Sequence, residues 1–256
     1  MRGEKGIIII AAYRGRGRGE YAMEKTLICI GGGELRTKMT LGIDAYCATL
    51  AYRHAAGNRP NALFIPTASH DSKPYFNTFR KTYTSVFDVK ADLILTVRGG
   101  EMNEADMDAK FQAADLIYVG GGDTWYMLQE WRRTGVGRRI VSAYRRGVPV
   151  VGLSAGAICW FDRMYTDSQI VEGLGDGFCL MDGWGLLYGM MTPHYNQRPE
   201  FDSVVLRERA AAYAIEDNCA LHFADGVIRR TVTTGGKAYY LDATSGELVK
   251  TEINVQ

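Results

Sequence analysis

The segment VPVVGLSAGAICWF, residues 148–161, decides the fold. It joins an apolar run to a G-L-S-A-G turn and then to residues that can begin a helix. A continuous apolar run bounded by glycine is typical of a strand buried on both faces of a parallel sheet. The segment therefore predicts a strand–turn–helix unit in an α/β protein, with Ser154 at the sharp turn.

Working outward from this unit, apolar runs alternate with helix-like segments throughout the preceding chain. The runs lie at 26–30, 62–66, 92–96 and 115–122, and the helix-like segments at 41–56, 73–87, 104–112, 123–133 and 136–146. This βαβ alternation predicts an α/β fold with a doubly wound, mostly parallel sheet flanked by helices and right-handed crossovers.

After Ser154 the sequence no longer alternates long apolar runs with helix-like segments. We expect a helix over 199–214, followed by four short strands divided by Asp-Gly, Gly-Gly and Ser-Gly turns, at 219–223, 227–232, 237–241 and 247–253. Such turns between short alternating runs indicate β-hairpins. The tail is therefore predicted to be a C-terminal β-hairpin extension of the same sheet.

Composition restricts the class of protein. The chain has 256 residues, of which 46% are hydrophobic and 23% charged, and a formal net charge of +1. We expect one domain over 23–256, preceded by a flexible extension over 1–22, and no nucleic acid or membrane partner. Five scattered cysteines without a C-x-x-C motif predict free thiols in a reducing compartment, and therefore a cytoplasmic location.

Ser154 is the predicted nucleophile. The flanking residues of a nucleophile elbow must be small, and G-L-S-A-G meets that requirement. The helix that follows would direct its N-terminal N–H groups at a developing oxyanion. A second glycine cluster, YVGGGDTW, lacks the G-K-[ST] of a phosphate-binding loop, so we expect Gly121 or Gly122 to join Ala155 in an oxyanion hole. No cofactor and no metal are expected.

A serine nucleophile requires a base, and the chain has four histidines. His194 is favoured because Pro193 fixes the backbone before it, and His70 is the alternative because it follows a predicted strand end. His54 and His222 are predicted to be structural. The acidic group that orients the imidazole is left open among five residues between Ser154 and His194, with a slight preference for the second because it lies in a turn: Asp162, Asp167, Glu172, Asp176 and Asp182.

These motifs, taken in order, resemble the serine peptidase family of dipeptidase E (alpha-aspartyl dipeptidase) and cyanophycinase, and in particular its bacterial peptidase E-like members. The resemblance runs from about residue 26 to 241 and is carried by L-F-I-P-T-A-S at 63–69, V-G-G-G-D-T at 119–124, G-L-S-A-G-A-I-C-W-F at 152–161, T-D-S at 166–168, G-L-L-Y-G…P-H-Y at 185–195 and I-E-D-N-C-A-L at 215–221. The resemblance implies a class I glutamine-amidotransferase-like fold and hydrolysis of short peptides. It also implies a triad of Ser154, His194 and Asp167.

Three further residues bear on substrate preference. Thr166 stands where the aspartyl dipeptidases of the family have Asn, which weakens the expectation of an N-terminal acidic residue. Arg163 and Arg198 are spaced so that both could meet a substrate carboxylate. We expect a dipeptidase-like enzyme, monomeric or homodimeric. An esterase, or a noncatalytic binding protein on the same fold, is the alternative.

Overall fold

The structure is a computed structural model that describes residues 24–173 and 175–256. The extension predicted over 1–22 lies outside these residues. Within them, no helix combines the length and the apolar character needed to cross a membrane.

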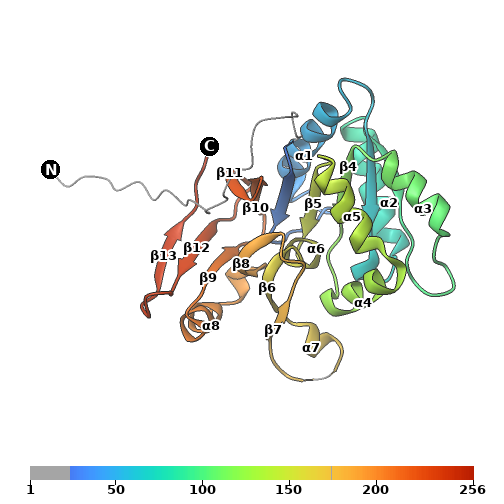
Figure 1. The fold of residues 1–256 in the computed structure, drawn as a ribbon. Helices are drawn as coiled ribbons and strands as arrows, with labels where there is room; N and C mark the ends of the chain where they lie inside the picture. The colour runs from blue at the N-terminus through green and yellow to red at the C-terminus, as the bar shows by residue number, and fades with distance from the viewer. Residues whose placement is uncertain (1–23, 174) are drawn as a thin grey trace, which may run out of the picture.

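A seven-stranded sheet forms the centre of the molecule, with the strand order β11-β10-β1-β5-β4-β2-β3 (Figure 1). Five of its strands run parallel, and β10 and β11 add an antiparallel hairpin beside β1. This confirms the doubly wound, mostly parallel sheet. The strands are β1 (Thr26–Ile30), β2 (Asn61–Ile65), β3 (Lys90–Leu93), β4 (Leu116–Val119), β5 (Val150–Leu153), β10 (Cys219–Ala224) and β11 (Val227–Thr233).

A hydrophobic core lies on each face of this sheet. Successive side chains of β1 pack into one core and then the other, because a strand directs alternate side chains to opposite faces. Ile28 and Ile30 pack with α1 and α2, whereas Leu27 and Cys29 pack with α3, α4, α5 and the short α6. Helices therefore cover both faces of the sheet. They are α1 (Leu41–His54), α2 (Lys73–Val86), α3 (Glu104–Gln112), α4 (Thr124–Thr134), α5 (Val136–Arg145) and α6 (Ala155–Ile158).

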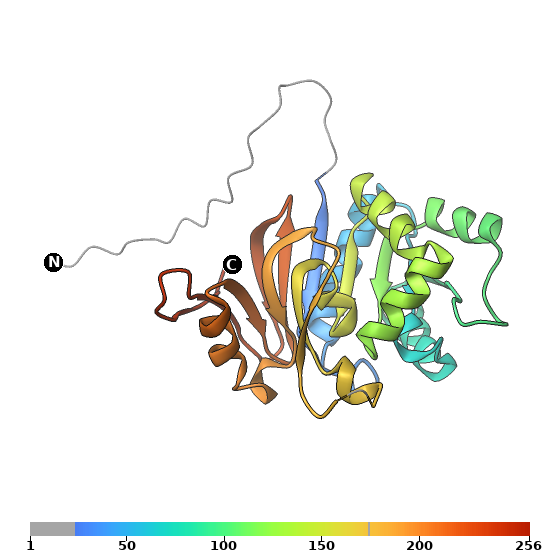
Figure 2. The same cartoon turned by 60° about the horizontal axis from the view of Figure 1, so that its bottom comes forward.

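A second, six-stranded sheet was not predicted. Its order is β13-β12-β9-β8-β6-β7, and it packs beside the first sheet (Figures 1 and 2). The predicted helix over 199–214 is only partly correct, because α8 ends at Glu208 and a buried strand follows. The remaining elements are β6 (Phe161–Thr166), α7 (Ser168–Val171), β7 (Cys179–Asp182), β8 (Leu187–Thr192), α8 (Phe201–Glu208), β9 (Ala211–Ile215), β12 (Ala238–Asp242) and β13 (Val249–Glu252), with 3₁₀ turns at Thr67–Ser69 and Tyr195–Gln197.

The predicted C-terminal hairpins are present, but they belong to two different sheets. β10 and β11 extend the first sheet, whereas β12 pairs with β9 and β13 pairs with β12 in the second. The turn from β9 to β10 therefore passes from one sheet to the other.

The two sheets meet where several strands end. The His194 N–H, just after β8, donates to the Gly31 carbonyl at the end of β1, at 3.1 Å. Asp217, between β9 and β10, forms an isolated bridge with Gly32. Because ligands of open α/β sheets bind beyond the carboxyl ends of the strands, this junction is the place to look for a site.

Candidate active site

Ser154 occupies a strained turn between β5 and α6. Its φ of 52° and ψ of −109° lie outside the regions that a residue with a side chain normally adopts. The Ser154 N–H donates to the Ile30 carbonyl at 3.0 Å, and its own carbonyl accepts from Ile158. These bonds hold the backbone of the turn and leave the Ser154 hydroxyl at the mouth of a cavity. This is the geometry of a nucleophile elbow.

The glycines beside Ser154 are required by close backbone contacts. A Cβ at Gly152 would lie 1.9 Å from the carbonyl oxygen of Gly156, and one at Gly156 would lie 2.3 Å from that of Val119. Neither distance can be tolerated between atoms that are not bonded. The G-x-S-x-G spacing is therefore set by how tightly α6 packs on β4 and β5.

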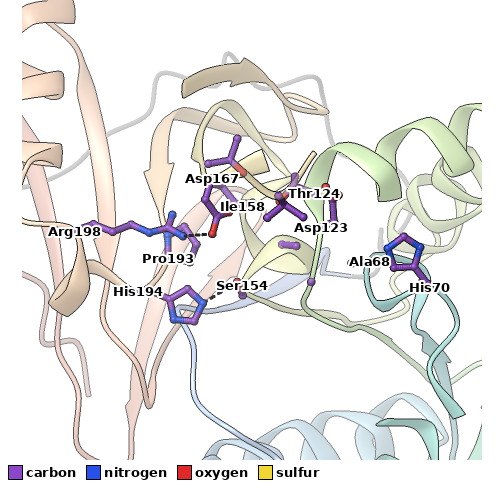
Figure 3. Close-up of a pocket in the computed structure, with 14 residues that line it drawn as sticks. Ala68, His70, Asp123, Thr124, Ser154, Ile158, Asp167, Pro193, His194 and Arg198 are labelled. Atoms are coloured by element: carbon purple, nitrogen blue, oxygen red, sulfur yellow. Dashed lines mark hydrogen bonds and ion pairs between the residues drawn. The ribbon is translucent and has the colours of Figure 1, made fainter. Parts of the chain in front are cut away.

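His194 contacts Ser154 directly. Its Nε2 lies 2.9 Å from the Ser154 Oγ, and its Nδ1 lies 2.6 Å from Oδ1 of Asp217 (Figure 3 shows the first contact). A carboxylate can only accept a hydrogen bond, so the proton of the neutral imidazole belongs on Nδ1. Nε2 is then free to accept the hydroxyl proton of Ser154, as a general base must.

Asp217 is held by three donors. Oδ1 faces His194, while Oδ2 accepts from the side-chain amides of Gln197 at 2.7 Å and Asn196 at 3.2 Å. The hydrogen bond from His194 is the main cause that lowers the pKa of the Asp217 carboxyl, and the Asn196 and Gln197 amides lower it further. Asp217 therefore stays ionised and can stabilise an imidazolium at His194.

The expectation that Asp167 orients the imidazole does not agree with this geometry. Asp167 precedes α7, and its Oδ2 lies 3.6 Å from the Arg198 guanidinium instead (Figure 3). Asp217 lies outside the segment between Ser154 and His194 that contains the five expected candidates. Asp217 lies 23 positions after His194 and reaches it because β8 and β9 are neighbouring parallel strands. In the sequence, Asp217 could have been identified as a candidate because it is an acidic residue in the polar turn of I-E-D-N-C-A-L.

Some backbone N–H groups near Ser154 already donate a hydrogen bond within the protein, and others have no acceptor there. Gly120 and Asp123 donate to backbone carbonyls, and the Gly121 N–H points to the Tyr75 hydroxyl at 3.4 Å. No acceptor within the described chain takes the N–H of Gly122, and Ala155 opens a helix, where the N–H has no intrahelical partner. Of the three predicted oxyanion donors, Gly122 and Ala155 are thus available and Gly121 is engaged.

Two cavities open from the Ser154–His194 pair. The first, of about 470 Å³, is lined by polar residues that include His70, Asp123, Thr124 and Asp167 (Figure 3). The second, of about 510 Å³, has a more apolar wall that includes Leu35, Pro74, Tyr75 and Leu153, and its lining also includes Arg36 and Glu34. If a bond of a bound molecule lies at Ser154, the groups on its two sides would therefore occupy different cavities.

The three predicted substrate-binding residues differ in position. Thr166 and Arg198 line the first cavity, whereas Arg163 pairs with Glu208 at 2.9 Å and lines neither cavity. Thr166 is buried and its hydroxyl lies 2.9 Å from that of Ser168. Arg163 is therefore placed away from a substrate at Ser154.

Arg198 is buried and already surrounded by partners. Its guanidinium donates to the carbonyl of Tyr165 at 3.0 Å and to the Thr192 hydroxyl at 3.3 Å, faces Asp167, and lies over the ring of Phe178. Burial lowers the pKa of Arg198, although Asp167 opposes that shift. Its Nη1 group is therefore used inside the protein, and its Nη2 group faces Asp167.

The other histidines are separate from the Ser154 hydroxyl. His70 lines the first cavity and packs at a tilt against Tyr126, with ring centroids 4.0 Å apart, but it makes no hydrogen bond to Ser154. His54 contacts Asp115 at 3.0 Å and His222 contacts the Tyr46 hydroxyl at 2.8 Å. In the part of the chain described, no group of three or more His, Cys, Asp or Glu side chains is arranged to hold a metal ion.

The chain is similar to known peptidases in sequence and in fold. The model of peptidase family S51 matches residues 27–231. The protein named Uncharacterized peptidase YgaJ of Bacillus subtilis is 30% identical over 240 residues, which cover 91% of this chain and 98% of that protein. Peptidase E of Citrobacter koseri is 32% identical over 154 residues, 59% of this chain and 62% of that enzyme.

Structural similarity extends over nearly the whole chain. The crystal structure of a peptidase from an acI-B1 Actinobacterium superposes with a TM-score of 0.67 at 17% identity, covering 91% of this chain and 96% of that one. This similarity confirms the fold class expected from the sequence. With the family match over residues 27–231, the chain belongs to peptidase family S51 and is a serine peptidase.

Proposed function

We propose that this protein hydrolyses short peptides through an acyl-enzyme formed on Ser154, with His194 as general base and Asp217 as the residue that orients it. The observation that carries the proposal is the continuous contact from the Ser154 Oγ through His194 to Asp217, with distances of 2.9 and 2.6 Å. No other histidine within the described residues hydrogen-bonds the Ser154 hydroxyl.

The proposed reaction begins when Nε2 of His194 accepts the Ser154 hydroxyl proton. The oxygen attacks the peptide carbonyl carbon, and the negative charge that develops on the carbonyl oxygen is stabilised by the N–H groups of Gly122 and Ala155. The imidazolium then gives its proton to the leaving amine as the C–N bond breaks. Water attacks the acyl-enzyme by the same base and releases the second product.

The cavities support short peptides as substrates. Each is a pocket of limited volume, and together they provide space on both sides of Ser154. We propose that the first cavity holds the amino-terminal residue and that the second holds the leaving residue against Leu35, Pro74 and Tyr75. Arg36 also lines the second cavity, where its exposed guanidinium pairs with Glu34 at 3.0 Å. We propose that its remaining N–H groups bind the free carboxylate of a dipeptide.

A panel of substrates tests this proposal. Wild-type protein should hydrolyse dipeptides such as Ala-Leu, and it should lose activity as the peptide lengthens. Ser154→Ala should reduce kcat by several orders of magnitude, because removing the nucleophile abolishes the acyl-enzyme route. Hydrolysis of esters without hydrolysis of any short peptide would show that the protein is an esterase instead.

A further inference from the structure

A single turn of the chain holds the acid of the proposed triad. His194, Asn196 and Gln197 lie within four consecutive residues. All three donate to the carboxylate of Asp217, at 2.6, 3.2 and 2.7 Å respectively. The side-chain carbonyl of Asn196 also accepts the backbone N–H of Asp217 at 3.0 Å. The same turn therefore supplies both the base and the groups that hold its acid.

The side chains of this turn serve two different purposes. Tyr195 and Arg198 are buried, and each makes side-chain hydrogen bonds that fix the turn inside the protein. Asn196 and Gln197 lie between them and are exposed. Within the described residues, the side-chain amides of Asn196 and Gln197 hydrogen-bond to Asp217 alone. The contact that these two amides make is therefore the one with the acid.

The Asp217 carboxylate needs such a contact because an aspartate side chain rotates easily about its Cβ–Cγ bond. The Asp217 side chain is 21% exposed, so water competes for its oxygens. With Oδ2 held by two amides, a rotation that takes Oδ1 away from Nδ1 of His194 would break all three hydrogen bonds. The amides therefore favour the orientation in which Oδ1 faces the base and keeps the proton on Nδ1.

Neither amide lies where a substrate at Ser154 would be bound. Asn196 and Gln197 line a third cavity, of about 620 Å³, together with Asp217. Neither residue lines the two cavities that open at Ser154. An effect of these amides on the reaction would therefore pass through Asp217.

We propose that Asn196 and Gln197 are positioning residues, which fix the Asp217 carboxylate in the orientation that activates His194 and so set the reactivity of Ser154. This inference rests on the proposed function, because it assumes the same serine, histidine and aspartate. It extends the catalytic apparatus by two side chains that do not touch the reacting atoms.

The rate at which a fluorophosphonate labels Ser154 measures this effect without a peptide substrate. Gln197→Ala should slow labelling by about fivefold or more, the scale of one exposed hydrogen bond. Asn196→Asp should slow it at least as much, because it keeps the acceptor for the Asp217 N–H but replaces the donor by an oxygen. Gln112→Ala is the matched control, since it removes an exposed glutamine at the end of α3, and it should label at the wild-type rate.

A double-mutant cycle with Asp217→Ala separates positioning from a general structural role. Because Gln197 acts through the Asp217 carboxylate, Gln197→Ala should slow labelling of the Asp217→Ala protein by less than about twofold. An equal loss in both backgrounds would overturn the inference, since the amide would then act elsewhere. With a dipeptide substrate, the loss in Gln197→Ala should fall on kcat, and a loss confined to KM would also overturn the inference. Melting temperatures check that each variant is folded.

The outcomes separate this inference from the proposed function. Wild-type labelling rates in both Gln197→Ala and Asn196→Asp overturn the inference and leave the mechanism at Ser154 intact. A wild-type labelling rate in Asp217→Ala overturns the proposed mechanism, and the inference with it. The expected labelling rates in a protein that hydrolyses no short peptide would support the inference and overturn the proposed substrate.

Discussion

At the scale of single residues, the site depends on one imidazole that has different partners on its two nitrogens. The carboxylate of Asp217 fixes the proton on Nδ1 of His194, so that Nε2 presents its lone pair to Ser154. The residue on Nδ1 therefore decides whether the base is in the tautomer that the chemistry requires. This makes Asp217, rather than Asp167, the acid whose removal should disable the base.

Asp217→Asn should lower kcat by about a thousand- to ten-thousandfold, because an amide can stabilise the wrong tautomer of the base. The direct measurement is the proton NMR signal of the His194 Nδ1–H, which a short bond to a carboxylate moves strongly downfield. That signal should disappear in Asp217→Asn and remain in Asp167→Asn. Loss of the signal in Asp167→Asn alone would show that Asp167 orients the imidazole.

Tyr75 should hold the loop that carries Gly121 and Gly122 in place. Burial raises the pKa of Tyr75 to about 12, so its hydroxyl stays protonated, and its oxygen receives the Gly121 N–H. Tyr75→Phe should lower kcat by about two- to tenfold, which corresponds to the loss of one neutral hydrogen bond. The matched control is Tyr126→Phe, which removes a hydroxyl near His70. An equal loss of kcat in both variants would argue against a specific role of Tyr75.

The sequence predicted Ser154 and His194 correctly as neighbours because both carry strong local signals. Ser154 stands in a motif whose glycines are set by contacts within the strand–turn–helix unit, and Pro193 marks the backbone before His194. Asp217 has no such local signal, since its partner lies across the junction of two sheets. Their catalytic roles remain predictions that the experiments above address.

At the scale of elements, the end of β1 makes room for the His–Asp pair. A Cβ at Gly32 would lie 1.9 Å from Oδ1 of Asp217 and 2.4 Å from Nδ1 of His194. Within the G-G-G that follows β1, Gly32 therefore makes room for His194 and Asp217, and no phosphate needs to be invoked to explain it.

Gly32→Ala should displace His194 and lower kcat/KM by about a hundredfold or more, since small misplacements of a base are that costly. Gly100→Ala is the control, because a Cβ there would meet only one atom, at 3.8 Å. Activity assays alongside circular dichroism check the effect. Full activity in a folded Gly32→Ala would contradict the close approach described here.

Most elements up to β5 were predictable because β1, β2, β4 and β5 are apolar runs and three of the helices have side-chain caps. β3 is the exception, since it spans Lys90–Leu93, mostly before the apolar run predicted at 92–96. Ser72, Asn103 and Asp123 cap α2, α3 and α4 with their side chains. Beyond α6 the prediction failed in part, since the strands of the second sheet are short and pair with partners far along the chain. β9, for example, follows α8 after only two residues, which made the two resemble one longer helix.

At the scale of the whole molecule, His222 links stability to pH. Burial is the main cause that lowers its pKa to about 4, and nearby Arg229, Arg230 and Arg53 lower it further. An unfolded chain has a histidine pKa of about 6.5, so the unfolded state binds more protons between these values. The contribution of His222 to stability is therefore complete above pH 6.5 and is lost as the pH falls toward 4.

His222→Phe should flatten this dependence while leaving peptidase activity at neutral pH near that of the wild type, because His222 lies on β10 against Tyr46 and lines neither cavity at Ser154. Urea unfolding at several pH values between 4 and 7 gives the free energy of unfolding for both proteins. The same decline in both would show that His222 does not cause it.

The whole molecule also explains why the site needs both sheets. β5 of the first sheet supplies Ser154, β8 of the second supplies His194, and the β9–β10 turn that connects the sheets supplies Asp217. Reactivity at Ser154 therefore reports on the assembly of all three parts, whatever the substrate.

The most direct test is the rate at which a fluorophosphonate labels the protein, followed by intact mass and peptide mapping. The account predicts one adduct, on Ser154, with labelling abolished in Ser154→Ala and strongly slowed in both His194→Ala and Asp217→Asn. Labelling of another residue, or equal rates in wild type and His194→Ala, would contradict a nucleophile activated by His194.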